Sequence, residues 1–452
     1  MRAKIAAAVA AMCLAAAPTS ADRWSVGFPG GVQIETEDGD RLRLRITEDG
    51  RTLKIDSYGH FELNEEETDV IRLDSGGKMR IEDRRRGMTT HRLELRGLPD
   101  GRIERDYERG DVREFDAQGR EWLAGVLTTV LRNTSFDAEG HIERVLRRSG
   151  ADGALREIEH IESDHTKREC YVLLLEMAPP DPALAPRIAE SAGREFGSDH
   201  QLTELILLLM ESQPDDPVLS AACVKITRQI GSDHERGRAL LHILTRGEIG
   251  AELVTAIAKS ADDMGSDHER AEVLIAVADT QSLDSLTAVA FFEAVNGTGS
   301  DHETRRVLVS TLAQHGAKPH IASGAARCAD RIGSDHERAE VLRAIVEMAP
   351  LGPELAPEFF TAASGLGSDH ECGRVLLAAL QNGPLAPEVL RELLESAAEI
   401  GSDHKKAEVL GEVVRTQKLE GELRSYFQSI VGDIGSDAER SRVLELLRDK
   451  DS

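Results

Sequence analysis

A four-residue string that returns at a constant interval constrains the fold of this chain more than any other feature. Gly-Ser-Asp-His occurs seven times, and each copy begins 34 residues after the one before. A related string, Gly435-Ser436-Asp437-Ala438, follows at the same interval, and a degenerate copy starts at Glu162. A fixed period between about 20 and 50 residues is typical of stacked repeats. The seven copies begin at Gly197, Gly231, Gly265, Gly299, Gly333, Gly367 and Gly401.

Each repeat is predicted to form two helices. In the unit that begins at Gly333, apolar residues recur at helical spacing on both sides of a Pro-containing break at residues 350–353. Because one hairpin cannot bury both apolar stripes alone, each hairpin must pack against its neighbours. We therefore expect a mainly α chain, with an αα-hairpin solenoid of 34-residue repeats over residues 163–452. The period is that of tetratricopeptide repeats, although their Trp, Gly-Tyr and Ala-x-x-x-Phe landmarks are missing. The two stripes consist of Val341, Leu342, Ile345, Val346 and Ala349, and of Leu355, Phe359, Ala362 and Leu366.

Helix capping accounts for most of the repeated string. The glycine fits a left-handed position just past a helix, and the serine fits the N-cap of the next helix. The glutamate three residues later fits the reciprocal half of a capping box. The aspartate lies in the first turn, where a negative charge is favourable near the positive helix end. The predicted capping glutamates are Glu235, Glu269, Glu303, Glu337, Glu371 and Glu439.

Capping does not explain the histidine, because any residue would serve at its position. The last copy has Ala438 there, and no further copy follows it in the sequence. This pattern predicts an inter-repeat ladder, in which each imidazole contacts an aspartate or a helix-end carbonyl of the next unit. The aspartates of the ladder are Asp199, Asp233, Asp267, Asp301, Asp335, Asp369 and Asp403.

A row of metal sites is a second interpretation of the same residues, since Asp and His are common zinc ligands. Adjacent Asp and His in a first turn point in different directions, so we expect no metal and no cofactor. A third interpretation is pH sensing, because a row of imidazoles would gain charge together near pH ~6. The candidate metal ligands are His200, His234, His268, His302, His336, His370 and His404.

The sequence before the repeats predicts three further segments. Residues 1–21 carry Arg2 and Lys4 before a short apolar run and small residues, the pattern of a signal peptide. Residues 22–115 alternate apolar and charged residues between Asp-Gly turns, which predicts an antiparallel β meander or sandwich with outward Arg/Glu pairs. Residues 116–162 are predicted to be a helical connector that caps the array. The protein is expected in the periplasm or outside the cell, and no later stretch has the length of a membrane helix.

Composition excludes some partners. The chain has 55 Lys and Arg against 81 Asp and Glu, a formal charge of −26. Nucleic acids and anionic membranes are therefore disfavoured as partners, because both are bound through Lys and Arg. Four cysteines outside the signal segment lie mostly in non-adjacent repeats, so we expect buried thiols and no disulfides. These are Cys170, Cys223, Cys328 and Cys372.

The string Ser-Asp-His-Glu-Arg followed by Val-Leu, as at residues 334–342, resembles the repeats of uncharacterised exported bacterial proteins with Ser-Asp-His/Tyr-Glu arrays. The segment from Val70 to Leu98 resembles the sheet region that precedes those repeats. In some relatives such arrays follow a membrane metallopeptidase of the antibiotic-sensor type. This chain has no His-Glu-x-x-His motif, so the resemblance implies architecture and no peptidase activity.

Together these features predict a non-enzymatic exported scaffold that binds protein or peptide partners through a solenoid. One alternative is a self-assembling structural protein. Its last helix, residues 436–448, would be covered by another copy, and head-to-tail contacts of this kind produce open filaments. The second alternative is a metal-binding protein that uses the Asp-His row. The apolar residues of that last helix are Val443, Leu444, Leu446 and Leu447.

Overall fold

The computed structural model describes residues 24–28, 32–37, 41–213, 215–316 and 318–451. The predicted signal peptide, residues 1–21, lies outside the described residues. Contacts divide the chain into two units, Met1–Ser212 and Gln213–Ser452, which are described separately. This division falls inside the array predicted from residue 163 onward. Because each hairpin of a repeat array contacts only its neighbours, a division based on contacts can fall between any two hairpins.

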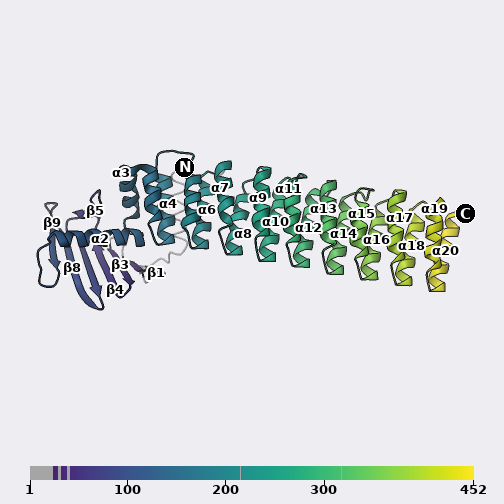
Figure 1. Ribbon diagram of the computed structural model, residues 1–452, viewed down its shortest axis with the longest axis horizontal. Coiled ribbons are helices and arrows are strands. Elements are labelled where there is room, and N and C mark those ends of the chain that lie inside the picture. The colour runs from purple at the N-terminus through teal and green to yellow at the C-terminus, as the bar shows by residue number, and fades with distance from the viewer. Residues whose placement is uncertain (1–23, 29–31, 38–40, 214, 317, 452) are drawn as a thin grey trace. The chain divides into compact units, whose positions relative to one another are not determined.

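The predicted fold class is confirmed: an antiparallel β domain precedes a mainly helical chain of αα-hairpins (Figure 1). In the first unit, seven antiparallel strands form one sheet in the order β1-β2-β3-β4-β7-β8-β9, and β5 pairs with β6. A tight turn at Asp49-Gly50, with φ of 45° and 75°, joins β3 to β4 as the Asp-Gly signal predicts. The strands are β1 (Trp24–Phe28), β2 (Val32–Glu37), β3 (Arg41–Glu48), β4 (Arg51–Tyr58), β5 (Phe61–Leu63), β6 (Val70–Leu73), β7 (Lys78–Arg85), β8 (Met88–Gly97) and β9 (Ile103–Glu108).

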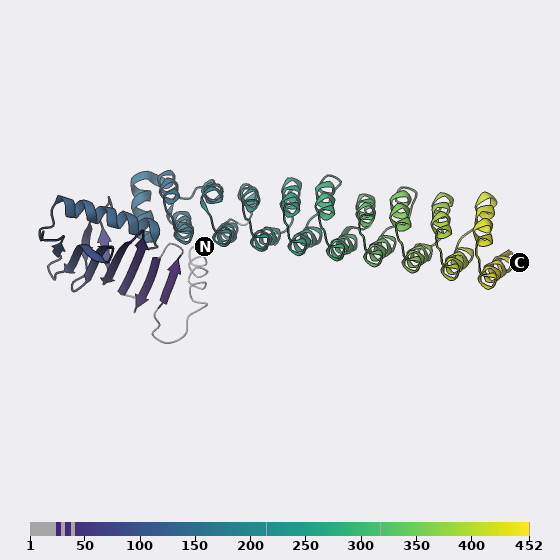
Figure 2. The same ribbon diagram turned by 60° about the horizontal axis from the view of Figure 1, so that its bottom comes forward.

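One face of this sheet is covered by α2 (Ala117–Asn133), as Figure 2 shows. The period-two pattern places alternate apolar side chains toward the helix, and the helical pattern of α2 supplies the opposing stripe. The resulting core is fully closed to solvent. Its buried residues include Leu53, Ile55, Met79, Ile81, Leu93, Leu95, Leu123, Val126, Leu127 and Val130.

The remaining helices of the first unit are α3 (Ala138–Glu159), α4 (Asp164–Met177), α5 (Leu184–Glu195) and α6 (Asp199–Ser212). The helix α3 packs against α4 and α5. It is kinked at Gly150, whose φ of 64° lies outside the helical region. The predicted connector therefore consists of a helix on the sheet and a kinked helix beside the first hairpin.

In the second unit, helices alternate between two layers. We call the helices that begin in the Ser-Asp corner A helices and those that follow them B helices. Each A helix packs against the next A helix, and each B helix against the next B helix (Figures 1 and 2). The A helices are α8 (Asp233–Leu244), α10 (Asp267–Thr280), α12 (Asp301–His315), α14 (Asp335–Met348), α16 (Asp369–Gln381), α18 (Asp403–Thr416) and α20 (Asp437–Asp451). The B helices are α7 (Pro217–Thr227), α9 (Ala251–Asp262), α11 (Thr287–Asn296), α13 (Pro319–Ala329), α15 (Ala356–Ser364), α17 (Pro387–Ala398) and α19 (Gly421–Gly432).

The apolar stripes predicted for the repeat that begins at Gly333 are buried. Val341, Leu342 and Ile345 of α14 are fully buried, as is Phe359 of α15. Most equivalent positions in the other repeats carry Val, Leu, Ile, Ala or Phe and are also buried, while Cys223 and Thr311 fill two of them. The interior of the array is therefore built mainly from aliphatic and Phe side chains supplied by every hairpin in turn.

A buried ionic cluster joins the β5–β6 loop to α3 within the first unit. The Glu67 carboxylate accepts hydrogen bonds from His141 Nδ1 at 2.7 Å and Arg144 Nε at 2.9 Å. Burial alone would raise the pKa of Glu67, but the hydrogen bonds and charges of His141 and Arg144 lower it below its ordinary value of 4.5. Arg144 also donates to Asp137 at 2.7 Å. Both carboxylates lie on residues with positive φ, 58° for Glu67 and 52° for Asp137.

Replacing this carboxylate is expected to change how stability depends on pH. Because the pKa of Glu67 is lowered by folding, its contribution is complete above its unfolded value and is lost as the pH falls through its folded value. The Glu67→Gln variant should lose about 2 kcal/mol of stability at neutral pH, because His141 and Arg144 lose their anion. Its stability should then fall less steeply than that of the wild type below pH ~4.5. Thermal unfolding followed by circular dichroism between pH ~7 and pH ~3 measures both effects. The exposed Glu66→Gln control should follow the wild-type curve, and a parallel shift of both variants would contradict the assignment.

Candidate functional site

The repeated corner is the most regular polar arrangement in the described residues. Each serine caps its A helix, accepting a hydrogen bond from the amide three residues later at 3.3–3.4 Å. The N-cap prediction is therefore confirmed in all of them. The cap is geometrically the same where the third residue is Glu303 and where it is Lys405.

The aspartates form the link between consecutive repeats. Asp301 is the first residue of α12, and its carboxylate accepts from the Gly333 amide at 3.1 Å and the Ser334 amide at 2.8 Å. Asp233 binds the Gly265 and Ser266 amides in the same way, at 3.0 and 2.7 Å. The carboxylate thus satisfies amides at the start of the next A helix, where the helix dipole also favours a negative charge. The same glycine contact is made by Asp267, Asp335, Asp369 and Asp403 in the second unit and by Asp164 in the first. Asp199 occupies the equivalent position at the start of α6.

Two details of the predicted corner are wrong, and both follow from this link. None of the repeated glycines at the described corners has a positive φ. An added Cβ would meet the approaching carboxylate in a tight contact of 3.0 Å at Gly435, but in an ordinary contact of 3.4 Å at Gly333. The capping box is also absent at Ser266 and Ser334, because their amides donate to the preceding aspartate and not to the glutamate three residues later.

The histidines do contact the next repeat, but their partner is the glutamate and not an aspartate or a carbonyl. His234 Nδ1 lies 3.1 Å from the Glu269 carboxylate, and His404 Nδ1 lies 2.8 Å from Glu439. The contacts of His268, His302 and His336 are longer, 3.5–3.8 Å. These imidazoles are 58–68% exposed, so each pair stabilises the array by well under 1 kcal/mol. At His370 the corresponding next residue is Lys405, which pairs with Glu408 instead. His200 is an exposed second residue of α6.

The geometry does not bring metal ligands together in the part of the chain that the structure describes. Within these residues, no group of three or more His, Cys, Asp or Glu side chains converges on one point. Asp301 is turned toward backbone amides of the next repeat, while the neighbouring His302 is turned toward Glu337. The row of histidines is therefore a row of separate exposed pairs.

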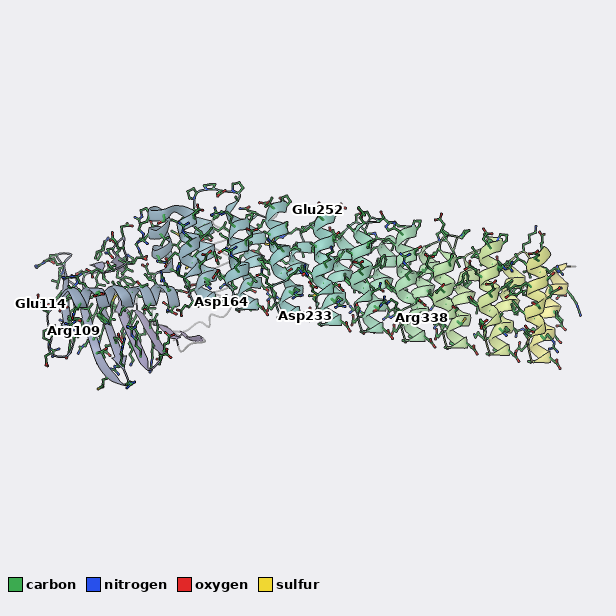
Figure 3. All side chains as sticks on the ribbon, in the orientation of Figure 1. Arg109, Glu114, Asp164, Asp233, Glu252 and Arg338 are labelled. Atoms are coloured by element: carbon green, nitrogen blue, oxygen red, sulfur yellow. The ribbon has the colours of Figure 1, made fainter. Side chains whose placement is uncertain are left out.

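A basic residue two positions after the histidine covers the end of the preceding B helix. Arg338 donates from Nε and Nη2 to the Ile332 carbonyl at 2.9 and 2.6 Å, and Arg236 binds the Ile230 carbonyl in the same way. In Figure 3, Arg338 lies along the edge where the A helices begin, as does Asp233. The sequence contains this signal as Arg or Lys in the sixth position of most repeats, but the helix-capping argument did not use it. Carbonyls at a helix end need such partners because they have none within the helix.

Charges alternate in the eighth position of consecutive repeats, which is the sixth residue of each A helix. The residues are Arg238, Glu272, Arg306, Glu340, Arg374, Glu408 and Arg442. Arg306 bridges Glu272 of the repeat before at 2.7 Å and Glu303 of its own repeat at 2.6 Å. Arg374 bridges Glu340 and Glu371 at 3.0 and 2.8 Å. The resulting line of ion pairs runs along the outer surface of the A helices.

Beside this line, the A helices expose part of an aliphatic row. From α8 to α16, the same position of successive A helices carries a partly buried aliphatic residue, except in α14, where it carries Arg343. We call the four aliphatic residues the aliphatic row: Leu241, Ile275, Val309 and Leu377. Along each A helix, the charged position lies three residues before the row position, and small residues such as Ala276 and Ala344 directly follow it. This surface combines apolar contact with charge pairing, which are the ingredients of protein interfaces.

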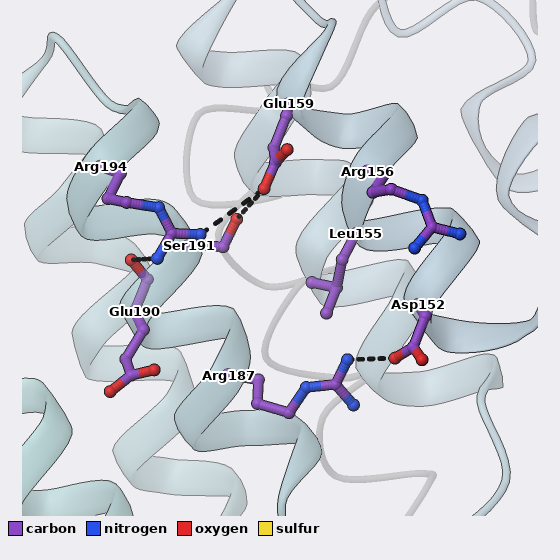
Figure 4. A pocket seen from close by; sticks show the side chains of 8 residues that line it. All are labelled: Asp152, Leu155, Arg156, Glu159, Arg187, Glu190, Ser191 and Arg194. Carbon is purple, nitrogen blue, oxygen red and sulfur yellow. Dashed lines mark hydrogen bonds and ion pairs between the residues drawn. The ribbon is translucent and has the colours of Figure 1, made fainter.

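An open pocket of about 300 Å³ lies between α3 and α5 of the first unit (Figure 4). Most of its charged groups bind one another. Arg187 pairs with Asp152, and Arg194 lies 3.6 Å from Glu159 and donates to the Glu190 carbonyl at 3.2 Å. The Ser191 hydroxyl lies 2.8 Å from the Tyr171 hydroxyl and donates to the Glu159 carboxylate at 3.5 Å. The pocket is lined by Asp152, Leu155, Arg156, Glu159, Arg187, Glu190, Ser191 and Arg194.

The four cysteines are free and buried, as predicted. Burial raises the pKa of Cys170, Cys223 and Cys328 to about 12 and that of Cys372 to about 11. Such thiols are not nucleophiles at neutral pH. No helix among the described residues is both long and apolar enough to cross a bilayer.

No protein-family model matches this chain, and no curated protein matches it. Among solved structures, the chain is similar to a "Circular tandem repeat protein with novel repeat topology and enhanced subunit contact surfaces". The identity is 16%, the match covers 74% of this chain and 78% of the other, and the TM-score is 0.18. A TM-score this low carries no argument, so the repeat fold rests on the geometry of the chain itself. The resemblance to exported Ser-Asp-His repeat proteins stays a prediction.

Removing one ladder carboxylate tests whether it holds consecutive repeats together. The Asp301→Ala variant leaves the Gly333 and Ser334 amides without their acceptor and should lose about 1–2 kcal/mol of stability. Urea unfolding measures the loss, and amide hydrogen exchange should accelerate at these two residues. Asp437→Ala is the matched control, since that carboxylate is 88% exposed and binds Arg440 of its own helix. Equal losses in the two variants would contradict the role of the ladder.

Proposed function

We propose that this protein is an exported, non-enzymatic scaffold that binds extended peptide segments of protein partners along its A helices. The observation that supports this most directly is the aliphatic row beside a line of alternating charges on consecutive helices. A repeat array offers such a surface at regular intervals, and its length allows many weak contacts to add up.

Within each repeat, the positions that maintain the fold differ from the positions whose residue type varies between repeats. The corner serine and aspartate recur in every copy, and most buried positions remain apolar. In contrast, the aliphatic-row position carries Leu241, Ile275, Val309, Arg343 and Leu377 in successive repeats. A constant framework with variable exposed positions allows each repeat to contact a different part of one ligand.

The spacing of the helices fits an extended peptide. Neighbouring packed helices lie about 8–10 Å apart. A peptide in the extended polyproline II conformation advances about 3.1 Å per residue and returns to the same face at every third residue, so one repeat corresponds to about three peptide residues. Aliphatic side chains at every third residue of a ligand would therefore meet Leu241, Ile275 and Val309 in turn.

Self-assembly through the last helix has less support. Val443 and Leu447 of α20 are already 1% and 6% exposed within the chain. Of the four apolar residues named for this helix, only Leu444 and Leu446 stay partly exposed to a second copy, and we keep the scaffold as the proposed function.

A peptide library displayed on phage tests the binding surface. We expect the full chain to enrich peptides with aliphatic residues at every third position. The double variant Ile275→Asp with Val309→Asp should bind these peptides about tenfold more weakly, because it places two charges in the apolar contact. Fluorescence anisotropy with the enriched peptides measures the change.

Val289→Asp is the matched control for this experiment. Val289 is 58% exposed on the B helix α11, so the same substitution there should leave peptide binding unchanged. Failure to enrich any peptide above the bare support, or equal loss in variant and control, would refute the proposed surface.

Export is tested separately. Residues 1–25 fused to an alkaline phosphatase without its own signal should give active enzyme in bacteria, because its disulfides form only outside the cytoplasm. Leu14→Arg, which places a charge in the apolar run, should abolish the activity. Equal activity of both fusions would show that this segment is not a signal peptide.

A further inference from the structure

The sheet of the first unit has an open face opposite α2, and this face is strongly basic. No described helix of the first unit covers it (Figure 2). On the central strands β3, β4, β7 and β8, its outward positions hold nine Lys and Arg and only three carboxylates. We call this surface the basic face. Its cations are Arg41, Arg43, Arg45, Lys54, Lys78, Arg80, Arg84, Arg92 and Arg96, and its carboxylates are Asp56, Glu82 and Glu94.

The three carboxylates of the basic face are neutralised by their neighbours. Glu94 is only 5% exposed and accepts from Arg96 Nε at 2.8 Å, with Lys78 Nζ at 3.0 Å. Burial alone would raise the pKa of Glu94, but these hydrogen bonds and charges lower it, so the carboxylate stays ionised and covered. Glu82 between Arg80 and Arg84, and Asp56 between Arg41 and Arg43, follow the same pattern. The three carboxylates of the face are therefore paired with cations of the same face, and the remaining excess of positive charge lies at its surface.

Two cations on this face form no ion pair with a carboxylate among the described residues, although Lys54 lies opposite Glu82 in the register of β4 and β7. Arg45 and Lys54 lie directly opposite each other in the register of β3 and β4. Like charges in this arrangement destabilise a sheet. Thr47 and Thr52 follow as the next outward pair, with hydroxyls 3.5 Å apart. This corner of the face presents two charges and two hydroxyls that an anionic ligand would satisfy.

An exposed aromatic residue adds apolar contact to the same face. Tyr58 lies opposite Arg41 and Lys78 in the register, and it is 53% exposed. Tyrosine and arginine are the residue types enriched where protein interfaces concentrate their binding energy.

We propose that the basic face binds an acidic protein segment in extended conformation. Outward residues of one strand, such as Arg41, Arg43 and Arg45, are spaced about 6.7 Å apart. Carboxylates at alternate positions of an extended ligand have the same spacing, so Asp or Glu at every second residue meets successive cations. This surface belongs to the sheet and is independent of the aliphatic row on the A helices.

The charges around the face favour a short acidic segment over a long polyanion. Glu104, Asp106 and Glu108 of β9 line its edge on the same side of the sheet. A polyphosphate or an anionic bilayer would extend beyond the four central strands onto these carboxylates. The net charge of −26 also repels large polyanions at a distance. A peptide can instead place its carboxylates only where the cations lie.

The test uses the full chain and a labelled twelve-residue peptide of alternating Glu and Thr. Fluorescence anisotropy should detect binding that weakens when NaCl is raised from about 50 mM to about 500 mM. The double variant Arg45→Gln with Lys54→Gln should bind about five- to tenfold more weakly. It should also unfold at an equal or higher temperature than the wild type, because the like-charge pair is removed.

The matched control removes the same charge elsewhere. Arg327→Gln with Arg331→Gln, two exposed residues of the second unit at and just beyond the end of α13, should keep wild-type affinity. An equal loss in control and variant would overturn the proposal, because it would reflect net charge alone. Tighter binding of polyphosphate or of anionic lipid vesicles, lost in the Arg45/Lys54 variant, would also overturn it and assign the face to that ligand.

Discussion

The array depends on the hydrogen bonds that the corner aspartates accept from backbone amides of the next repeat. One carboxylate accepts from the amides of the following Gly and, at several corners, Ser, as Asp301 does with Gly333 and Ser334. These amides begin a helix and have no partner inside it, so the bond both satisfies them and fixes the position of the next A helix. The aliphatic interior supplies most of the free energy, but it is non-directional. The directional bonds at the corner set the register in which the apolar stripes meet.

Local rules predicted much of the fold, since they depend on residues a few positions apart. The serine caps and the buried stripe of Val341, Leu342 and Ile345 follow from short-range patterns. The reasons for the glycine and the histidine could not be found this way. The Gly333 amide donates to Asp301, and the His302 imidazole lies beside Glu337. These partners are 32 and 35 residues away in the sequence. A rule for one helix end contains no information about which side chain of the neighbouring repeat approaches it.

Charge is distributed unevenly over this acidic protein. In the sheet domain, nine cations are gathered on one face, although residues 22–115 contain 23 Asp and Glu against 18 Lys and Arg. Buried Glu94 and Glu82 show how this is tolerated, because each is held by several cations. In the repeats, by contrast, cations and anions alternate at short range, as in the Glu272–Arg306 pair. The net charge of the chain therefore says little about what either surface can bind.

The alternation of Arg and Glu along the A helices makes the structural period two hairpins, although the sequence motif repeats with every hairpin. Arg306 and Arg374 each stand between glutamates, and Glu340 stands between them. Loss or duplication of a single hairpin would place two arginines or two glutamates side by side and break the line of ion pairs. A change of two hairpins would preserve it. The line of ion pairs is thus kept only when the array gains or loses an even number of hairpins. This constrains which duplications and deletions of the gene preserve it.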